Sequence, residues 1–169
     1  MKTRWGEKLD KANVLSGYPR PQLKRESYIN LNGVWQYAIT SADAVPEAMD
    51  GEIIVPFSPE CELSGVNRTV HPNESLWYTR HFDIPSGFNH GRILLHFGAV
   101  DQIATVYING CDTGSHVGGY TAFTIDITPY IRQENVITVK VRDYSDMSYH
   151  SRGKQKTKRG GIWCSPQRG

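Results

Sequence analysis

The segment 143–155 gathers side chains that could recognise a polar ligand. Arg152, Lys154 and Gln155 carry guanidinium, ammonium and amide groups, which donate hydrogen bonds to hydroxyl and carboxylate oxygens, whereas Asp146 accepts them. This set suits the binding of a sugar or contact with carboxylates outside the segment. A solvated basic loop has the same composition, so the residues alone leave both interpretations open.

Aromatic side chains offer a second kind of contact, because the apolar C–H face of a sugar ring stacks on a flat ring. The candidates are Trp77, Tyr78, Tyr107, Tyr120 and Trp163. Most of them fall in stretches with the pattern of β-strands, where an aromatic ring is usually half-buried packing. We therefore expect packing in the core or at an interface for these rings, and keep Trp163 as the aromatic site candidate.

The sequence contains no recognisable catalytic or metal-binding pattern. Its six histidines are scattered, and Cys61, Cys111 and Cys164 lie far apart with no Cys-x-x-Cys pair. We expect reduced thiols, no metal, no cofactor and no catalytic residue. Asp101 and Asp126 follow or end a predicted strand, where a carboxylate commonly accepts hydrogen bonds from backbone N–H groups in a turn.

Size and charge narrow the function classes further. The 169 residues suffice for one domain, and the formal net charge is only +2. The lysines and arginine at 154–159 have no aromatic residues between them, so we expect no binding of nucleic acid. No signal-peptide-like segment or apolar run of membrane-spanning length is present. The sequence therefore predicts a cytoplasmic protein without membrane contact.

Alternating apolar and polar residues predict strands from residue 29 onward. The expected inward-facing sets are Ile93, Leu95 and Phe97; Ala104, Val106 and Ile108; Phe123, Ile125 and Ile127; and Ile137, Val139 and Val141. The dipeptide Asn109-Gly110 is typical of a two-residue hairpin turn. Strands with one apolar face pack face to face in two sheets, which predicts an all-β, antiparallel β-sandwich of jelly-roll type.

A series of motifs, taken in order, resembles the N-terminal sugar-binding domain of glycoside hydrolase family 2, and is most similar to that of β-galactosidases. The motifs are NLNGVW at 30–35, VPF at 55–57, LWY at 76–78, LHFGAVD at 95–101, VYING at 106–110, GSHVGGYT at 114–121, FTIDIT at 123–128 and GIW at 161–163. The resemblance covers residues 20–163. It implies a galactose-binding-like jelly roll.

The resemblance also implies that catalysis takes place in another domain. In this family the jelly roll precedes an immunoglobulin-like domain and a (β/α)₈ barrel, and the barrel carries the two glutamates of a retaining glycosidase, about 5 Å apart. The matched motifs contain no such pair. The expected function is thus a non-catalytic accessory domain whose partners are the remaining domains of a parent glycosidase. Weak contact with carbohydrate and self-association through an apolar surface near Trp163 are further expectations.

In family 2 β-galactosidases the loop corresponding to 143–155 reaches the mouth of the barrel's active site. The resemblance therefore marks Asp146, Arg152, Lys154, Gln155 and Trp163 as entrance candidates. Some members place an acidic residue in this loop that helps to hold a cation or the substrate. Arg152 and Lys154 stand at the nearest positions here, which argues against a metal. An autonomous lectin-like carbohydrate-binding module is the alternative function.

The sequence patterns and the resemblance together divide the chain into three predicted parts. Residues 1–28, with Pro19 and Pro21, are expected to form an extended arm, and residues 29–163 the jelly roll. Residues 164–169 depart from the family pattern, because Pro166 and Gly169 are poor strand residues. We expect a truncated or non-family tail there.

Overall fold

The computed structural model describes residues 3–88 and 90–153, and these form eight β-strands. The strands are β1 (Gly33–Thr40), β2 (Gly51–Val55), β3 (Ser75–Phe82), β4 (Leu94–Phe97), β5 (Ile103–Ile108), β6 (Cys111–Val117), β7 (Phe123–Asp126) and β8 (Asn135–Arg142). Five single 3₁₀ turns connect them: η1 (Gly6–Lys8), η2 (Pro21–Leu23), η3 (Glu62–Ser64), η4 (Thr128–Tyr130) and η5 (Ser145–Met147). Within the described ranges there is no α-helix, and hence no helix long and apolar enough to cross a bilayer.

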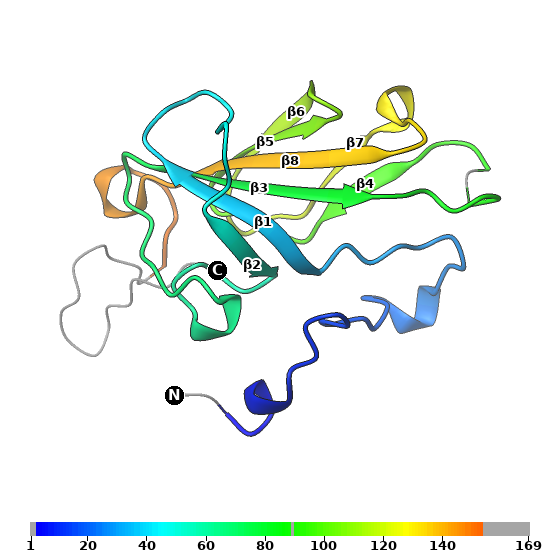
Figure 1. Ribbon diagram of the computed structural model, residues 1–169, viewed down its shortest axis with the longest axis horizontal. Coiled ribbons are helices and arrows are strands. Elements are labelled where there is room, and N and C mark those ends of the chain that lie inside the picture. Colours follow the sequence, from blue (N-terminus) through cyan, green and yellow to red (C-terminus); the bar gives the residue numbers. More distant parts are fainter. Residues whose placement is uncertain (1–2, 89, 154–169) are drawn as a thin grey trace.

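The strands form two antiparallel sheets. One has six strands in the order β2-β1-β3-β8-β5-β6, and the other pairs β4 with β7 (Figure 1). Residues of both sheets make up one hydrophobic core. The predicted all-β sandwich of jelly-roll type is confirmed.

The core contains the side chains that alternation along the strands placed there. Ala104, Val106 and Ile108 of β5 are fully buried, and Ile137 of β8 is buried to the same extent. Burying one such aliphatic side chain stabilises the fold by roughly 1.5–3 kcal/mol. Trp35 packs edge-on against Tyr78, with ring centroids 6.4 Å apart. Trp35 is 6% exposed and belongs to this core.

The hairpin between β5 and β6 turns at Asn109-Gly110, as predicted. Both residues have positive φ, 52° and 81°, which is the requirement of a type I′ turn. The Asn109 side chain also ties this hairpin to β8. Its Nδ2 donates to the carbonyl of Tyr130 at 2.8 Å and to Oδ1 of Asn135 at 3.0 Å, and its Oδ1 accepts the N–H of Val136 at 2.8 Å.

The outer face of the large sheet is partly covered by the β1–β2 loop. Lys140 of β8 donates to the Oδ1 of Asp43 in this loop at 2.9 Å and to its carbonyl oxygen at 3.1 Å. Beneath it lies Trp77, 1% exposed, with the Lys140 ammonium 5.2 Å from its ring centroid and the Tyr107 ring stacked at 6.3 Å. Trp77 and Tyr107 are therefore packing residues, as the sequence predicted.

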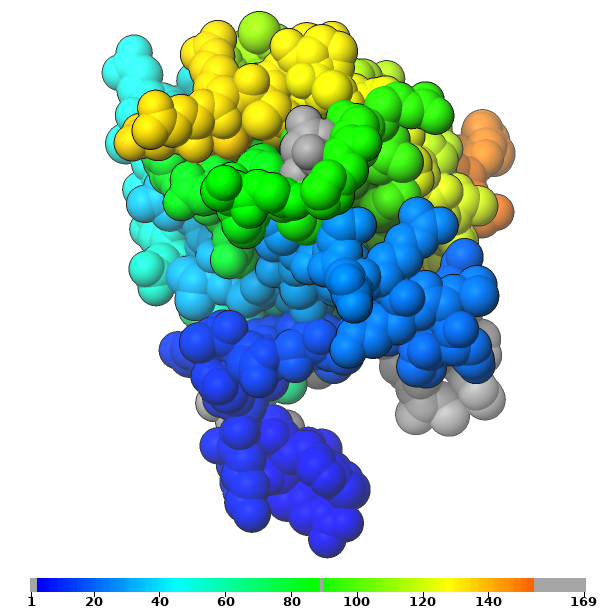
Figure 2. Space-filling view, turned by 90° about the vertical axis from the view of Figure 1, so that its right-hand side faces the viewer, coloured from blue at the N-terminus to red at the C-terminus, as the bar shows by residue number. Residues whose placement is uncertain are grey.

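The N-terminal segment lies against one side of the sandwich, and its first described residues project from the body (Figure 2). It carries η1 and η2, two turns that the sequence analysis did not anticipate. Val14 is buried, whereas Trp5, Leu15 and Leu23 are exposed.

Candidate functional site

Three connections of the chain meet at one end of the sandwich because of the strand register. Ile103, the first residue of β5, pairs with Val117 at the end of β6 and with Arg142 at the end of β8. The residues before β5 and after β6 and β8 must therefore emerge together. We call residues 101–102, 118–121 and 143–153 the loop cluster.

The β6–β7 turn rests directly on Asp101. A Cβ atom placed on Gly119 would clash with Oδ1 of Asp101, so only glycine fits without displacing that carboxyl group. The N–H of Gly118 donates to the carbonyl of Gln102 at 2.9 Å, and Gln102 itself is 6% exposed. Asp101 thus lies directly beneath the β6–β7 turn.

The 143–153 segment is organised around a buried carboxylate. The side chain of Asp143 is 1% exposed. It accepts the N–H of Ser145 at 2.6 Å and the Ser145 hydroxyl at 3.2 Å, and Nε2 of His150 lies 3.5 Å from its Oδ1. Burial of a carboxylate is tolerated when several donors surround it, so these contacts fix the path of the chain out of β8.

Tyr120 stands on the surface of the loop cluster, contrary to the packing role expected from the sequence. The residue is 59% exposed because it belongs to the turn after β6 rather than to a strand. Its hydroxyl oxygen lies near Gly153, on which an added Cβ would stand 3.6 Å away. Burial raises the pKa of Tyr120, and the negative charges of Asp101 and Asp143 raise it further.

The site residues proposed from the sequence fall into two groups. Asp146 lies in η5 and is exposed, and Arg152 is half-buried, with Nη1 donating to the carbonyl of Ser148 at 3.3 Å. Both belong to the loop cluster. Lys154, Gln155 and Trp163 lie outside the described residues, as does the apolar surface expected near Trp163.

Sequence reasoning missed Asp143, His150 and the exposure of Tyr120. A signal for Asp143 was available, because it continues the inward-facing series Ile137, Val139, Val141 of β8 and is buried like them. No local pattern marks His150, which reaches Asp143 only through the turn at η5. Nothing in the spacing shows that the ring of Tyr120 faces solvent.

The arrangement offers groups that can recognise a polar ligand. It combines an exposed phenol ring, the exposed carboxylate of Asp146 and the guanidinium of Arg152, groups that accept and donate hydrogen bonds to hydroxyls. Across the part of the chain that the structure describes, no three histidine, cysteine, aspartate or glutamate side chains are arranged to hold a metal.

Comparison with known protein families identifies the family of this chain. The model described as "Glycosyl hydrolases family 2, sugar binding domain" matches residues 63–165, more than half of the chain. The chain belongs to this family. Its sugar-binding domain is an accessory part of larger glycoside hydrolases, so the predicted family and the predicted accessory role are both confirmed.

Relatives of this family 2 domain carry two names. A β-glucuronidase of Paenibacillus borealis is 31% identical over 149 residues, which cover 83% of this chain and 25% of that protein. A β-galactosidase of Thermoanaerobacter pseudethanolicus is 41% identical over 76 residues, covering 42% of this chain and 10% of that protein. Among solved structures, Lactobacillus rhamnosus β-glucuronidase is similar with a TM-score of 0.58 and 28% identity, covering 67% of this chain and 20% of that one. The family 2 domain thus spans a quarter or less of the length of these relatives.

Proposed function

We propose that this family 2 domain serves a retaining glycosidase by lending its loop cluster to the entrance of an active site that other domains supply. The observation that carries the proposal is the size of the match: the chain corresponds to one sugar-binding portion of much longer β-glucuronidases and β-galactosidases. The remaining domains of the parent enzyme are then its partners, and the glycoside itself is the substrate that its loops help to position.

The geometry of the loop cluster supports this role. Asp146 and Arg152 stand on a segment whose base is fixed by the buried Asp143, so their backbone is held in place while their side chains meet solvent. A fixed base matters, because an ordered loop loses less conformational entropy when a ligand binds.

The test uses the parent enzyme with substitutions in this domain. We expect Asp146→Asn and Arg152→Ala each to raise KM for an aryl glycoside by about tenfold, since a hydrogen bond to a charged group contributes about 1.5–3 kcal/mol. Arg132→Gln is the matched control, because Arg132 is exposed at the opposite end of β8. Unchanged KM in both site variants would refute the proposal.

A second candidate, an autonomous lectin-like module, is favoured by the exposed rings of Tyr120 and Tyr149 in the loop cluster. Aromatic faces of this kind stack on sugars without help from another domain. An NMR titration of the isolated chain with methyl β-galactoside separates the two functions. Saturable shifts of the Tyr120 and Asp146 amides would favour the lectin, and their absence leaves the accessory role.

We also propose a cytoplasmic location and self-association through surfaces that the other domains of a parent glycosidase would cover. The free thiols of Cys61 and Cys111 support the first, because a reducing compartment preserves them. The exposed Trp5, Leu15 and Leu23 of the N-terminal segment support the second. Sedimentation velocity across a range of concentrations tests it, and a monomer at every concentration would exclude it.

A further inference from the structure

The outer face of the large sheet carries two aromatic rings beside two cations. Trp77 of β3 pairs with Lys140 of β8, so their side chains stand on the same face of the sheet. Arg142 lies two residues further along β8 and shares this face, because side chains alternate between the faces of a strand. The Tyr107 ring of β5 stacks on Trp77, with 6.3 Å between the ring centroids. We call Trp77, Tyr107, Lys140 and Arg142 the outer-face patch.

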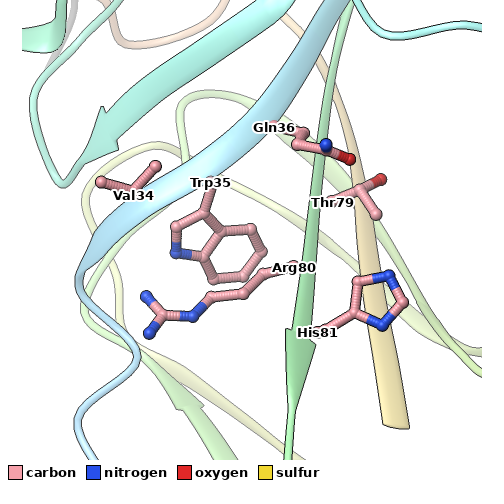
Figure 3. A pocket seen from close by; sticks show the side chains of 6 residues that line it. All are labelled: Val34, Trp35, Gln36, Thr79, Arg80 and His81. Atoms are coloured by element: carbon pink, nitrogen blue, oxygen red, sulfur yellow. The ribbon is translucent and has the colours of Figure 1, made fainter.

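The pocket at the other end of β3 shows how the two faces of this sheet differ (Figure 3). Trp35 and Arg80 point to the side of the core, whereas Gln36 and His81 point to the opposite side (Figure 3). Trp77 shares that opposite side with His81, since four residues separate them along β3. Gln36 and His81 are exposed there, so the outer face is open at this end. The burial of Trp77 on the same face therefore needs a cover.

The β1–β2 loop, residues 41–50, supplies that cover (Figure 1). Lys140 Nζ donates to Oδ1 of Asp43 at 2.9 Å and to its carbonyl oxygen at 3.1 Å, and Nη1 of Arg142 lies 3.8 Å from the same Oδ1. Trp77 beneath Lys140 is 1% exposed, but the side chain of Asp43 is 76% exposed. An ion pair with so exposed a partner is screened by water and holds the loop only weakly.

The closed loop leaves two donors of the outer-face patch without an acceptor. Nε1 of Trp77 and Nε of Arg142 are buried and have no hydrogen-bond partner among the residues that the structure describes. A buried N–H group that lacks an acceptor costs free energy. In addition, the single carboxylate of Asp43 faces two cations. The patch can therefore take up more acceptor groups and more negative charge than the loop provides.

We propose that the outer-face patch is a docking surface for an acidic peptide segment of a partner protein, and that the β1–β2 loop is a displaceable mimic of that segment. The loop contains Asp43, Glu47 and Asp50 and no basic residue, so its charge is complementary to the patch. Lys140 binds both the carboxylate and the backbone carbonyl of Asp43, which is how it would hold an aspartate of another peptide.

In the complex, the loop moves off the sheet and a carboxylate of the partner takes the place of Asp43. A second acidic side chain then pairs with Arg142, whose guanidinium accommodates two parallel hydrogen bonds from one carboxylate. The contacts come from β3, β5 and β8, so the docking surface does not depend on the function proposed for the loop cluster.

The first test measures whether the loop is displaceable. Asp43→Asn preserves the size of the side chain and the backbone carbonyl but removes the charge that Lys140 contacts. We expect the indole N–H of Trp77 to exchange with solvent about two- to fivefold faster, as the loss of an exposed ion pair allows. Asp126→Asn, at an exposed position of β7, is the matched control and should leave this exchange unchanged. Native exchange in Asp43→Asn contradicts a displaceable loop.

The second test measures docking itself, by NMR titration of the full chain with an acetylated and amidated peptide of the loop sequence SADAVPEAMD. We expect saturable shifts of the Trp77 indole N–H, and about two- to fivefold tighter binding to Asp43→Asn than to the native chain, because the loop then competes less. A peptide with asparagine and glutamine in place of its acidic residues should not bind. No saturable shift in Asp43→Asn, equal affinity for both chains, or equal binding of the neutral peptide overturns the proposal.

Lys140→Met separates opening of the loop from docking. Methionine keeps an apolar chain over the ring of Trp77 but cannot contact a carboxylate. We expect the indole N–H of Trp77 to exchange faster, as in Asp43→Asn, while the acidic peptide binds at least fivefold more weakly than it does to Asp43→Asn. Equal peptide affinity in these two variants would show that Lys140 does not recognise the acidic segment, and the docking surface would be wrong.

Discussion

Nε2 of His150 lies 3.5 Å from Oδ1 of Asp143, and both side chains are largely buried. This contact closes the segment after β8 back onto the sandwich. We expect His150→Ala to release it, so that the amides of Ser145 and Met147 exchange with solvent faster, although both now donate hydrogen bonds within the segment. Hydrogen exchange measured by NMR checks this, with His81→Ala, an exposed histidine, as control. Unaltered protection in His150→Ala would mean that the contact does not anchor the segment.

The tight fit of the β6–β7 turn on Asp101 can be tested with a pair of glycines. In Gly119→Ala the new Cβ would clash with the carboxyl group of Asp101, whereas a Cβ added at Gly98 would meet nothing within 4 Å beyond its chain neighbours. Neither glycine has a positive φ that would penalise alanine. We expect Gly119→Ala to lower the free energy of unfolding by about 1–3 kcal/mol, as overpacking does, and Gly98→Ala to leave it unchanged. Equal urea midpoints for both variants would contradict the close approach.

The side chain of Asn109 stabilises the β5–β6 hairpin beyond its backbone conformation. Asn109→Gly preserves the positive φ of the turn but deletes the hydrogen bonds to Tyr130, Asn135 and Val136. The unpaired partners should cost about 1–3 kcal/mol in urea unfolding. Cys111→Ser, at an exposed position next to the turn, should change stability by no more than about 0.5 kcal/mol. The interpretation fails if the two variants are equally stable.

Two surface carboxylates should titrate below their ordinary pKa for different reasons. The hydrogen bond and positive charge of Lys140 lower the pKa of Asp43, and the hydroxyl and N–H of Thr128 lower that of Asp126. A carboxyl group whose pKa is lower in the folded than in the unfolded state stabilises the fold when it is ionised. The stabilisation by Asp43 and Asp126 is therefore fully present above the ordinary aspartate pKa, and it is lost as the pH falls through the lowered pKa of each group.

Selective substitutions separate these two causes. In a carboxyl NMR titration, Lys140→Met should raise the pKa of Asp43 and leave the pKa of Asp126 unchanged. Thr128→Val should raise the pKa of Asp126 and leave the pKa of Asp43 unchanged. If the pKa of Asp43 does not respond to Lys140→Met, the ion pair between Lys140 of β8 and Asp43 of the β1–β2 loop is not formed in solution.

The strands and the core could be predicted because each depends on local alternation. Ile137, Val139 and Val141 occupy every second position and are buried. Asn109-Gly110 predicts its turn because these two residue types readily adopt the positive φ angles that the turn requires. The site depends on which strand ends meet. The contact of His150 with Asp143 is made by the turn at η5, which no sequence pattern marks. The meeting of residues 101–102, 118–121 and 143–153 arises from the pairing of strands far apart in sequence, which no local pattern encodes.

Whether this domain only assists catalysis is decided by measuring if the purified chain alone releases nitrophenol from aryl β-galactosides and β-glucuronides. We predict no release above that of buffer, because a retaining glycosidase needs two carboxyl groups about 5 Å apart and we expect this pair in another domain. Release that remains constant per mole of protein through successive purification steps, and that disappears when a glutamate of this chain is replaced by glutamine, would show that the chain is itself the catalyst.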